Sequence, residues 1–175
     1  DKKLENAYAI FDYSINNIEY FKKNKDYSKN IYYVPIDSFD GFEIKNDSFE
    51  YDVAFYGDPN SPRRNFLLQA LKKNFKVKII SEVFGDALYK ELSKARVIVN
   101  LHYYKNALLE TTRLYETLSL GRSIIVSEKS KDVDEDSRIQ DKIDFVDTGD
   151  VNELVEHIKF WLENEDERTR KVKEN

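Results

Sequence analysis

The chain has 175 residues and a formal net charge of -5, and 41% of its residues are hydrophobic and 35% charged. These values are typical of a globular domain with one core and a polar surface, and the acidic balance argues against nucleic-acid binding, which requires a basic face. The absence of cysteine excludes disulfides and thiolate catalysis, and two histidines are too few for a histidine-rich metal site.

No apolar stretch approaches the ~18 residues of a membrane span, and no signal peptide is visible. We therefore expect a cytoplasmic protein without a membrane span. The chain also contains no methionine, not even at position 1, which we interpret as the sign of a fragment or a processed chain. We expect residues 1–50 to be the remnant of a preceding domain with a linker, and residues 51–175 to form a separate domain.

The first part of the chain has little regular pattern. Apolar residues at rough helical spacing predict a helix and a connection within residues 1–30. A short strand is predicted over 31–35, ended by Pro35. Residues 36–50 are polar with scattered aromatic side chains, and we expect them to form a linker.

From Tyr51 onward, apolar strands alternate with helices. The predicted strands cover residues 51–57, 76–81, 96–101, 123–127 and 143–147. The first helix has a favoured start, with Ser61 as N-cap and Pro62 at the first helical position. The remaining helices are expected at 85–95, 111–120 and 150–165, with a charged helical tail after them.

The strands read as nearly continuous apolar runs, which is typical of a parallel sheet covered by helices on both faces. We therefore predict an α/β fold of the Rossmann-like, doubly wound type, with about five strands in the order 2-1-3-4-5. Ligands bind such sheets at the carboxyl ends of the strands, where the strand order reverses. The loops that meet there are 57–63 and 102–112, and both are polar.

The first of these loops, "GDPNSPRRN", begins at Gly57, which permits a sharp turn. Arg63 and Arg64 fall in the first turn of the following helix, where cations are unfavourable against the helix dipole. Two arginines at this place suggest a nearby anion, such as a phosphate. The alternatives are plain surface arginines or ion-pair partners of Asp58.

The second loop leads into the helix that begins at Thr111. Thr111 and Thr112 can cap this helix or donate hydrogen bonds, and their backbone amides form a positive helix end. A diphosphate placed there would also meet Arg113. Glu116, one helical turn further on, can accept two hydroxyl hydrogen bonds and so suits a ribose diol; a solvated glutamate or an internal salt bridge is the alternative.

Glu110 and His102 are the candidate catalytic residues. Glu110 stands at the start of the helix, where it can cap the helix or accept hydroxyls from a sugar. His102 ends the third strand, where it can contact a ligand or cap the sheet edge. The acidic run 132–141 lacks the glycine and the closing glutamate of an EF-hand loop, so we expect no metal site there or elsewhere.

Two stretches resemble the C-terminal domain of glycosyltransferases with the GT-B fold, namely "ARVIVNLHYY…LETTRLYETLSLGRSIIVSE" and "IDFVDTGDVNELVEHIKFWLENEDERTRK". The order of a strand ending in Asn-Leu-His, an "RxxEaLaxG" helix, an apolar strand and a "pxeLxxxIxxxL" stretch is similar to the group-1-like branch related to spore-maturation proteins. Upstream, "IFDYSINNIEYFKK" and "IYYVPI" resemble the end of the N-terminal domain in that branch. The resemblance covers most of residues 8–170 and implies one half of a GT-B fold, with residues 1–50 as the remnant of the N-terminal domain and linker and residues 51–175 as the nucleotide-sugar-binding domain.

The resemblance also implies which residues form the donor site. Glu116 stands five positions before Gly121, the place of the second glutamate in the family's E-x7-E motif, which implies contact with the donor ribose. The first glutamate would fall at position 108, which is Leu108 here, and Glu110 is offset from it by two. Either Glu110 takes that role through a shortened loop, or the donor sugar is contacted in another way.

Further positions match the family's donor site. The nucleotide base is implied to lie near residues 81–84, after the second strand. Basic residues that follow the family's first glycine loop correspond to Arg63 and Arg64. Positions that face the diphosphate correspond to Thr111, Thr112 and Arg113.

The implied activity is transfer of a sugar from a nucleotide-diphosphate donor to the hydroxyl of an acceptor that the sequence does not identify. Helix amides and arginines would stabilise the leaving diphosphate, with no metal or other cofactor required. The resemblance implies that the general base comes from the N-terminal domain, of which we expect this chain to contain only a remnant. We therefore expect donor binding with little or no turnover by the chain alone.

Two other interpretations were compared with this one. A receiver-like signalling domain shares the strand order but needs an aspartate at the end of the third strand, where this chain has Asn100, Leu101 and His102. A non-catalytic, degenerate transferase domain that serves as a protein-interaction module is the stronger alternative, and Leu108 favours it.

Overall fold

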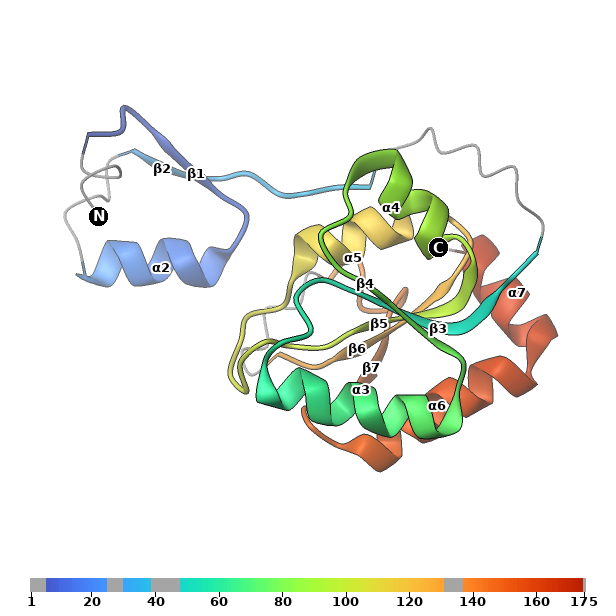
Figure 1. The fold of residues 1–175 in the computed structure, drawn as a ribbon. Helices are drawn as coiled ribbons and strands as arrows, with labels where there is room; N and C mark the ends of the chain where they lie inside the picture. Colours follow the sequence, from blue (N-terminus) through green and yellow to red (C-terminus); the bar gives the residue numbers. More distant parts are fainter. Residues whose placement is uncertain (1–5, 25–29, 39–47, 131–136, 175) are drawn as a thin grey trace. The chain divides into compact units, whose positions relative to one another are not determined.

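The computed structural model describes residues 6–24, 30–38, 48–130 and 137–174 (Figure 1). The chain divides into two units, Asp1–Asp37 and Ser38–Asn175, and each is described by itself. The predicted linker over 36–50 lies partly outside the described residues, which omit 39–47. The acidic run 132–141 is likewise described only from residue 137 onward.

The first unit contains two short parallel strands and one helix. Strand β1 (Ile10–Asp12) pairs with β2 (Ile31–Tyr33), and α2 (Ile15–Asn24) connects them. The helix begins where it does because the Ser14 hydroxyl accepts a hydrogen bond from the Asn17 amide at 3.2 Å. The helix predicted within residues 1–30 is observed at Ile15–Asn24, but Ile10–Asp12 forms a strand that was not predicted, because a run this short has no readable period.

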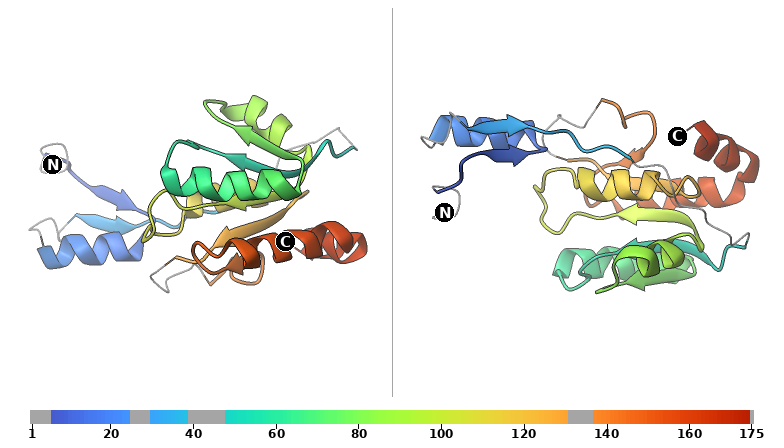
Figure 2. Two further views of the ribbon diagram at one scale, coloured as in Figure 1. Left: turned by 60° about the horizontal axis from the view of Figure 1, so that its bottom comes forward. Right: turned by 90° about the horizontal axis from the view of Figure 1, so that it is seen from above.

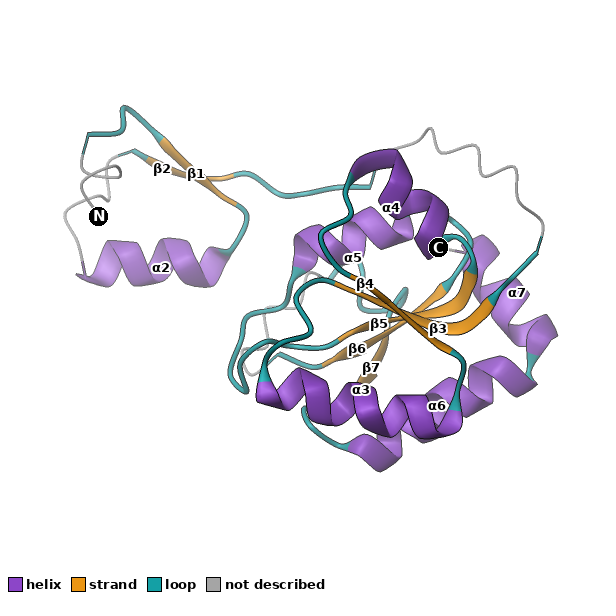
Figure 3. Ribbon diagram, in the orientation of Figure 1, coloured by secondary structure: helices purple, strands orange, loops and turns teal. Residues whose placement is uncertain are grey.

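The second unit contains a five-stranded, all-parallel sheet in the order β4-β3-β5-β6-β7 (Figure 3). This order confirms the predicted 2-1-3-4-5 arrangement. The strands are β3 (Tyr51–Tyr56), β4 (Val77–Ile80), β5 (Ala95–Asn100), β6 (Ile124–Glu128) and β7 (Asp144–Val146). The helices are α3 (Pro62–Asn74), α4 (Gly85–Leu92), α5 (Thr111–Leu118), α6 (Val151–Glu163) and α7 (Glu165–Glu174).

Alternate residues of β3 face opposite sides of the sheet, as the two-residue period of a strand requires. Val53 and Phe55 pack into the core beneath α3 and α6, and Ala54 and Tyr56 pack into the core beneath α4. Both layers are visible in Figure 1. Both faces of the strand are therefore buried, which explains its unbroken apolar sequence.

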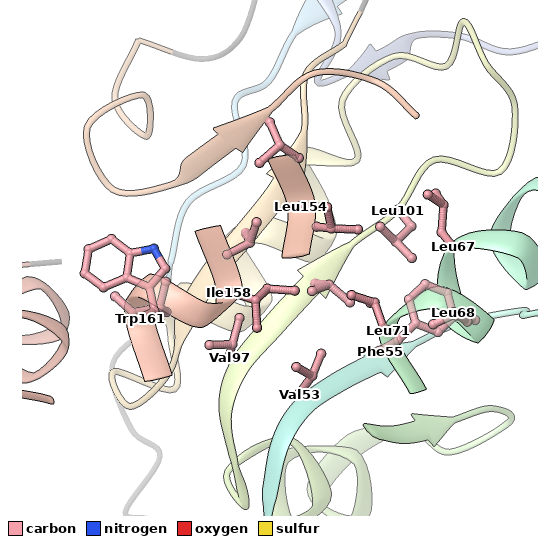
Figure 4. Packing of buried hydrophobic residues seen from close by; sticks show 14 residues of the cluster. Val53, Phe55, Leu67, Leu68, Leu71, Val97, Leu101, Leu154, Ile158 and Trp161 are labelled. Atoms are coloured by element: carbon pink, nitrogen blue, oxygen red, sulfur yellow. The ribbon is translucent and has the colours of Figure 1, made fainter. Parts of the chain in front are cut away.

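The larger core joins the sheet to α3 and α6 (Figure 4). Leu71 of α3 and Ile158 of α6 have no exposed surface, and Trp161 of α6 is only 8% exposed. Helix α7 follows α6 (Figure 2), and Arg168 donates a hydrogen bond to the Trp161 carbonyl at 2.8 Å. This core fixes α3 and α6 on one face of the sheet.

The starts of two helices that border these loops differ in how they are capped. Helix α3 begins as predicted, because the Ser61 side chain accepts from the Arg64 amide at 3.0 Å and Pro62 takes the first position. Helix α5 has Glu110 as N-cap, but the Glu110 side chain makes no capping hydrogen bond. The amide end of α5 is therefore left without a side-chain acceptor, while the Glu110 carboxylate is used elsewhere.

Candidate functional site

A cavity of about 610 Å³ opens at the carboxyl ends of β3 and β4. It lies beside the β3/β5 boundary, where the strand order reverses, and this is the position that the fold predicts. Three segments line it: the loop after β3, residues 81–85 after β4, and the first turns of α5. Of the residues predicted from the sequence, the cavity is lined by Gly57, Thr112, Arg113 and Glu116.

Arg113 is the arginine that lines this cavity. Its guanidinium carbon lies 5.0 Å from the centre of the Tyr56 ring, and its Nη1 donates to the Asn100 side-chain oxygen at 3.3 Å. Gly57 has a φ of +124°, and a Cβ at this position would lie 3.0 Å from Arg113 Nη2. Gly57 thus allows both the turn and the close approach of the guanidinium. Within the described residues, no carboxylate lies within ion-pair distance of Arg113.

Arg63 lies outside the cavity lining, because it pairs with a buried carboxylate. Its Nη1 donates to Glu128 Oε2 at 2.7 Å and to the His102 carbonyl at 2.9 Å, and its Nη2 contacts Glu128 Oε1. Glu128, at the end of β6, is 1% exposed and also accepts from the backbone amides of His102 and Gly149, each at 2.8 Å. The geometry gives Arg63 a structural role, and its contact with a phosphate stays a prediction.

Arg64 is also committed to protein partners and does not line the cavity. It is 3% exposed, its Nε donates to the Leu101 carbonyl at 2.8 Å, and its Nη1 donates to the Asp58 carbonyl at 2.9 Å. Its Nη2 lies 3.6 Å from Glu110 Oε1. Arg64 therefore ties the loop after β3 to the loop after β5, and its contact with a phosphate likewise stays a prediction.

His102 and Glu110, the predicted catalytic residues, form a hydrogen-bonded pair beside the cavity. His102 Nδ1 lies 2.8 Å from Glu110 Oε2, and His102 Nε2 lies 3.2 Å from the Lys129 carbonyl oxygen. Glu110 also accepts from the Asn100 side chain at 3.1 Å. His102 has no exposed surface, so the structure favours a role in holding Glu110 over direct contact with a substrate.

The surroundings of this pair favour its charged form. Burial by itself lowers the pKa of His102, but the Glu110 hydrogen bond and the charges of Glu110 and Glu128 outweigh it, so the pKa is raised. Burial by itself raises the pKa of Glu110, but His102, Asn100 and Arg113 outweigh it, so that pKa is lowered. Both ring nitrogens of His102 face acceptor oxygens, which suits the imidazolium ion.

These shifts predict how stability changes with pH. The contribution of His102 is complete below its ordinary pKa of 6.5 and is lost as the pH rises through the raised folded value. The contribution of Glu110 is present above its ordinary pKa of 4.5 and is lost as the pH falls through the lowered folded value. Urea unfolding should therefore give a higher free energy at pH 6 than at pH 9, and His102→Gln should reduce this difference. If the free energy of unfolding of His102→Gln differed between pH 6 and pH 9 by as much as that of the parent, the contribution assigned to His102 would be contradicted.

Glu116 is held by two tyrosines that the sequence analysis did not identify. Tyr56 Oη lies 3.0 Å from Glu116 Oε2, and Tyr89 Oη lies 3.0 Å from Glu116 Oε1. Burial raises the pKa of Tyr56, and the neighbouring Glu116 raises it further. With twelve tyrosines in the chain, nothing in the sequence distinguishes these two, because their role depends on where β3, α4 and α5 meet.

The amide end of α5 reaches the cavity at Thr112. The Thr111 amide donates to the Leu109 carbonyl at 2.9 Å and the Arg113 amide donates to the Glu110 carbonyl at 2.9 Å. Among the described residues, the Thr112 amide has no such acceptor, and Thr112 is an exposed residue of the cavity lining. The Thr111 hydroxyl is buried, has no hydrogen-bond partner in the described part of the chain, and does not belong to the lining. A positive helix end is therefore present at the cavity, as predicted.

The loop after β4 completes the cavity. Glu82 has a φ of +58°, a backbone conformation that non-glycine residues rarely adopt, and Phe84 is 81% exposed. Both line the cavity. The predicted base-binding segment, residues 81–84, is thus placed at the same cavity as Arg113 and Glu116.

In the part of the chain that the structure describes, no helix is long and apolar enough to span a membrane, and no group of three His, Asp or Glu side chains could hold a metal ion.

Comparison with known proteins adds to this geometry. The profile of a family described as "Glycosyl transferase-like" matches residues 47–175. No curated protein matches the chain significantly. Among solved structures, the crystal structure of TarM resembles the chain with a TM-score of 0.67 and 13% sequence identity, over 99% of this chain and 41% of TarM. At that identity the likeness concerns the fold alone, an α/β arrangement consistent with one Rossmann-like half of the GT-B fold.

Proposed function

The chain belongs to the glycosyl transferase-like family, and from this premise we propose that its cavity binds the nucleotide-diphosphate part of a sugar donor. The observation that carries the proposal is the position of Arg113, at the amide end of α5, in a cavity at the reversal of strand order. Its guanidinium has no carboxylate partner within ion-pair distance among the described residues, although the two other arginines nearby are committed to protein partners.

The diphosphate is proposed to bind at Arg113, at the Thr112 amide and beside the Gly57 backbone. A guanidinium presents a planar pair of donors that matches phosphate oxygens. The amide end of a helix adds donors and a favourable dipole for an anion. These three groups line the same cavity, which supports a single anion-binding position.

The nucleoside is proposed to extend from this position along α5. Glu116, one turn beyond Arg113, offers carboxylate oxygens to the ribose hydroxyls. The loop of residues 81–85 also lines the cavity, with Phe84 available to pack on the base. The donor sugar would then lie beyond the diphosphate, toward the loop that begins at His102.

In the proposed reaction, an acceptor hydroxyl attacks the donor sugar and the bond to the diphosphate breaks. Negative charge then develops on the leaving diphosphate, where Arg113 and the helix dipole stabilise it. The chain spans about two fifths of the length of TarM. The acceptor site and the base that takes the hydroxyl proton are therefore proposed to lie outside this chain, which on its own would bind the donor with little or no turnover.

Calorimetric titration of the folded chain with uridine, guanosine and thymidine diphosphates tests the proposal. We expect binding of at least one of them, weakened about tenfold by Glu116→Ala, since hydrogen bonds to a charged group are lost. Glu156→Ala, on the exposed side of α6, is the matched control and should bind as the parent does. No heat with any of the three nucleotides would instead favour the non-catalytic interaction module, for which Leu108 is the sequence argument.

A further inference from the structure

Glu116 differs from Glu110 and Glu128, the other acidic residues discussed above, in what surrounds it. Its two carboxylate oxygens each meet one phenol hydroxyl, that of Tyr56 or that of Tyr89, at 3.0 Å. Among the described residues it forms no ion pair. Glu110 and Glu128, by contrast, are paired with His102 and Arg63 respectively, so their charge is neutralised within the protein.

Two neutral donors fix a carboxylate without using up its capacity to accept. An ionised carboxylate has about four lone-pair positions on its two oxygens. Each phenol occupies one position on a different oxygen, which leaves one or more free on each. Glu116 lines the cavity, so a pair of neighbouring hydroxyl groups on a ligand could donate to both oxygens at once.

The two phenols come from different elements, and this fixes the carboxylate in two directions. Tyr56 ends β3 and is 8% exposed, and its single hydroxyl proton is shared between Glu116 Oε2 and the Arg113 carbonyl oxygen, which lies 2.9 Å from the hydroxyl. Tyr89 lies on α4 and packs against the same core cluster as Tyr56. Burial, followed by the proximity of Glu116, raises the pKa of each tyrosine. Both therefore remain protonated donors at neutral pH.

We propose that Tyr89, together with Tyr56, is a positioning residue that sets the Glu116 carboxylate to receive the vicinal diol of a nucleotide ribose. This inference rests on the proposed function, because it concerns the ribose end of the same cavity. It assigns to a hydroxyl on α4 a share in ribose recognition, although Tyr89 is not itself among the residues that line the cavity.

Titration of Tyr89→Phe with two ligands tests the proposal. The ligands are uridine or guanosine diphosphate, whichever binds the parent chain more tightly, and its 2′,3′-dideoxy analogue. The variant should bind the ribonucleotide about fivefold more weakly and the dideoxy analogue within about twofold of the parent. The control Tyr20→Phe removes a hydroxyl from an exposed tyrosine of the first unit and should change neither affinity.

Each outcome separates this inference from the proposed function. If the parent binds no nucleotide, the proposed function fails and the inference fails with it. If the parent binds nucleotides but Tyr89→Phe weakens the binding of both ligands equally, or of neither, the proposed donor site is retained and the positioning role is refuted. In a Glu116→Ala background, Tyr89→Phe should have no further effect on ribonucleotide affinity, because the group that it orients is gone. An additive loss there would also overturn the proposal.

Discussion

Replacing Glu128 by alanine is expected to lower the free energy of unfolding by about 3–5 kcal/mol, because the change leaves the half-buried Arg63 guanidinium without its counter-ion. The same carboxylate accepts from the backbone amides of His102 and Gly149. Both donors would lose their acceptor in the variant, which adds to the loss. Urea unfolding followed by the fluorescence of Trp161, the single tryptophan of the chain, measures the effect.

Two further variants are compared with Glu128→Ala, one as an intermediate case and one as a control. Glu128→Gln retains one acceptor oxygen but no charge and should fall between the parent and Glu128→Ala, which matters if the alanine variant does not fold. Glu174→Ala removes one partner of an exposed ion pair on α7 and should cost no more than about 0.5 kcal/mol. A loss below about 1 kcal/mol for Glu128→Ala would show that the buried pair does not hold the strand ends together.

Arg113→Ala is expected to weaken nucleoside-diphosphate binding between about tenfold and a hundredfold, the range for lost hydrogen bonds to a charged group. The reason is that Arg113 is the one cavity-lining arginine among the described residues. Calorimetry with the nucleotide that binds the parent chain measures the change. Arg113→Lys keeps the charge but loses the planar pair of donors, so its affinity should lie in between.

Comparison of ligands shows whether this loss is specific to phosphate. The corresponding nucleoside, which has no phosphate, should bind Arg113→Ala and the parent equally well. Arg96→Ala, which removes a half-buried arginine from the start of β5, serves as the control and should leave nucleotide affinity unchanged. Equal weakening of nucleotide and nucleoside by Arg113→Ala would contradict a phosphate contact and point to a disturbed cavity.

The sheet could be predicted from the sequence because its strands are buried on both faces and alternate with helices. The first strand, for example, was predicted over 51–57 and is observed at Tyr51–Tyr56. The strand at Ile10–Asp12 could not be predicted, because three residues are too few to show an alternation. Its pairing with Ile31–Tyr33 lies between segments separated along the chain, which local pattern does not reveal.

The position of the cavity could also be predicted, because parallel strands of one sheet end at the same edge. The contacts that the charged side chains make could not be predicted from the sequence. Arg63 and Glu128 are 65 residues apart, and their contact depends on how β6 is placed against β5. Arginines at a helix start can bind either a ligand or a buried carboxylate, and only the tertiary structure shows that Arg63 has the second kind of partner.

Helix α5 places one cationic and one anionic side chain in the lining of the cavity. Arg113 and Glu116 are three positions apart, about 4.5 Å along the helix axis, and they bring opposite charges to the same hollow. A ligand with an anionic group at one end and a hydroxylated ring at the other can contact both side chains favourably in one orientation only. In the reversed orientation its anionic group would lie beside the Glu116 carboxylate and be repelled. The orientation of the proposed donor would thus be set by two side chains on adjacent turns of α5.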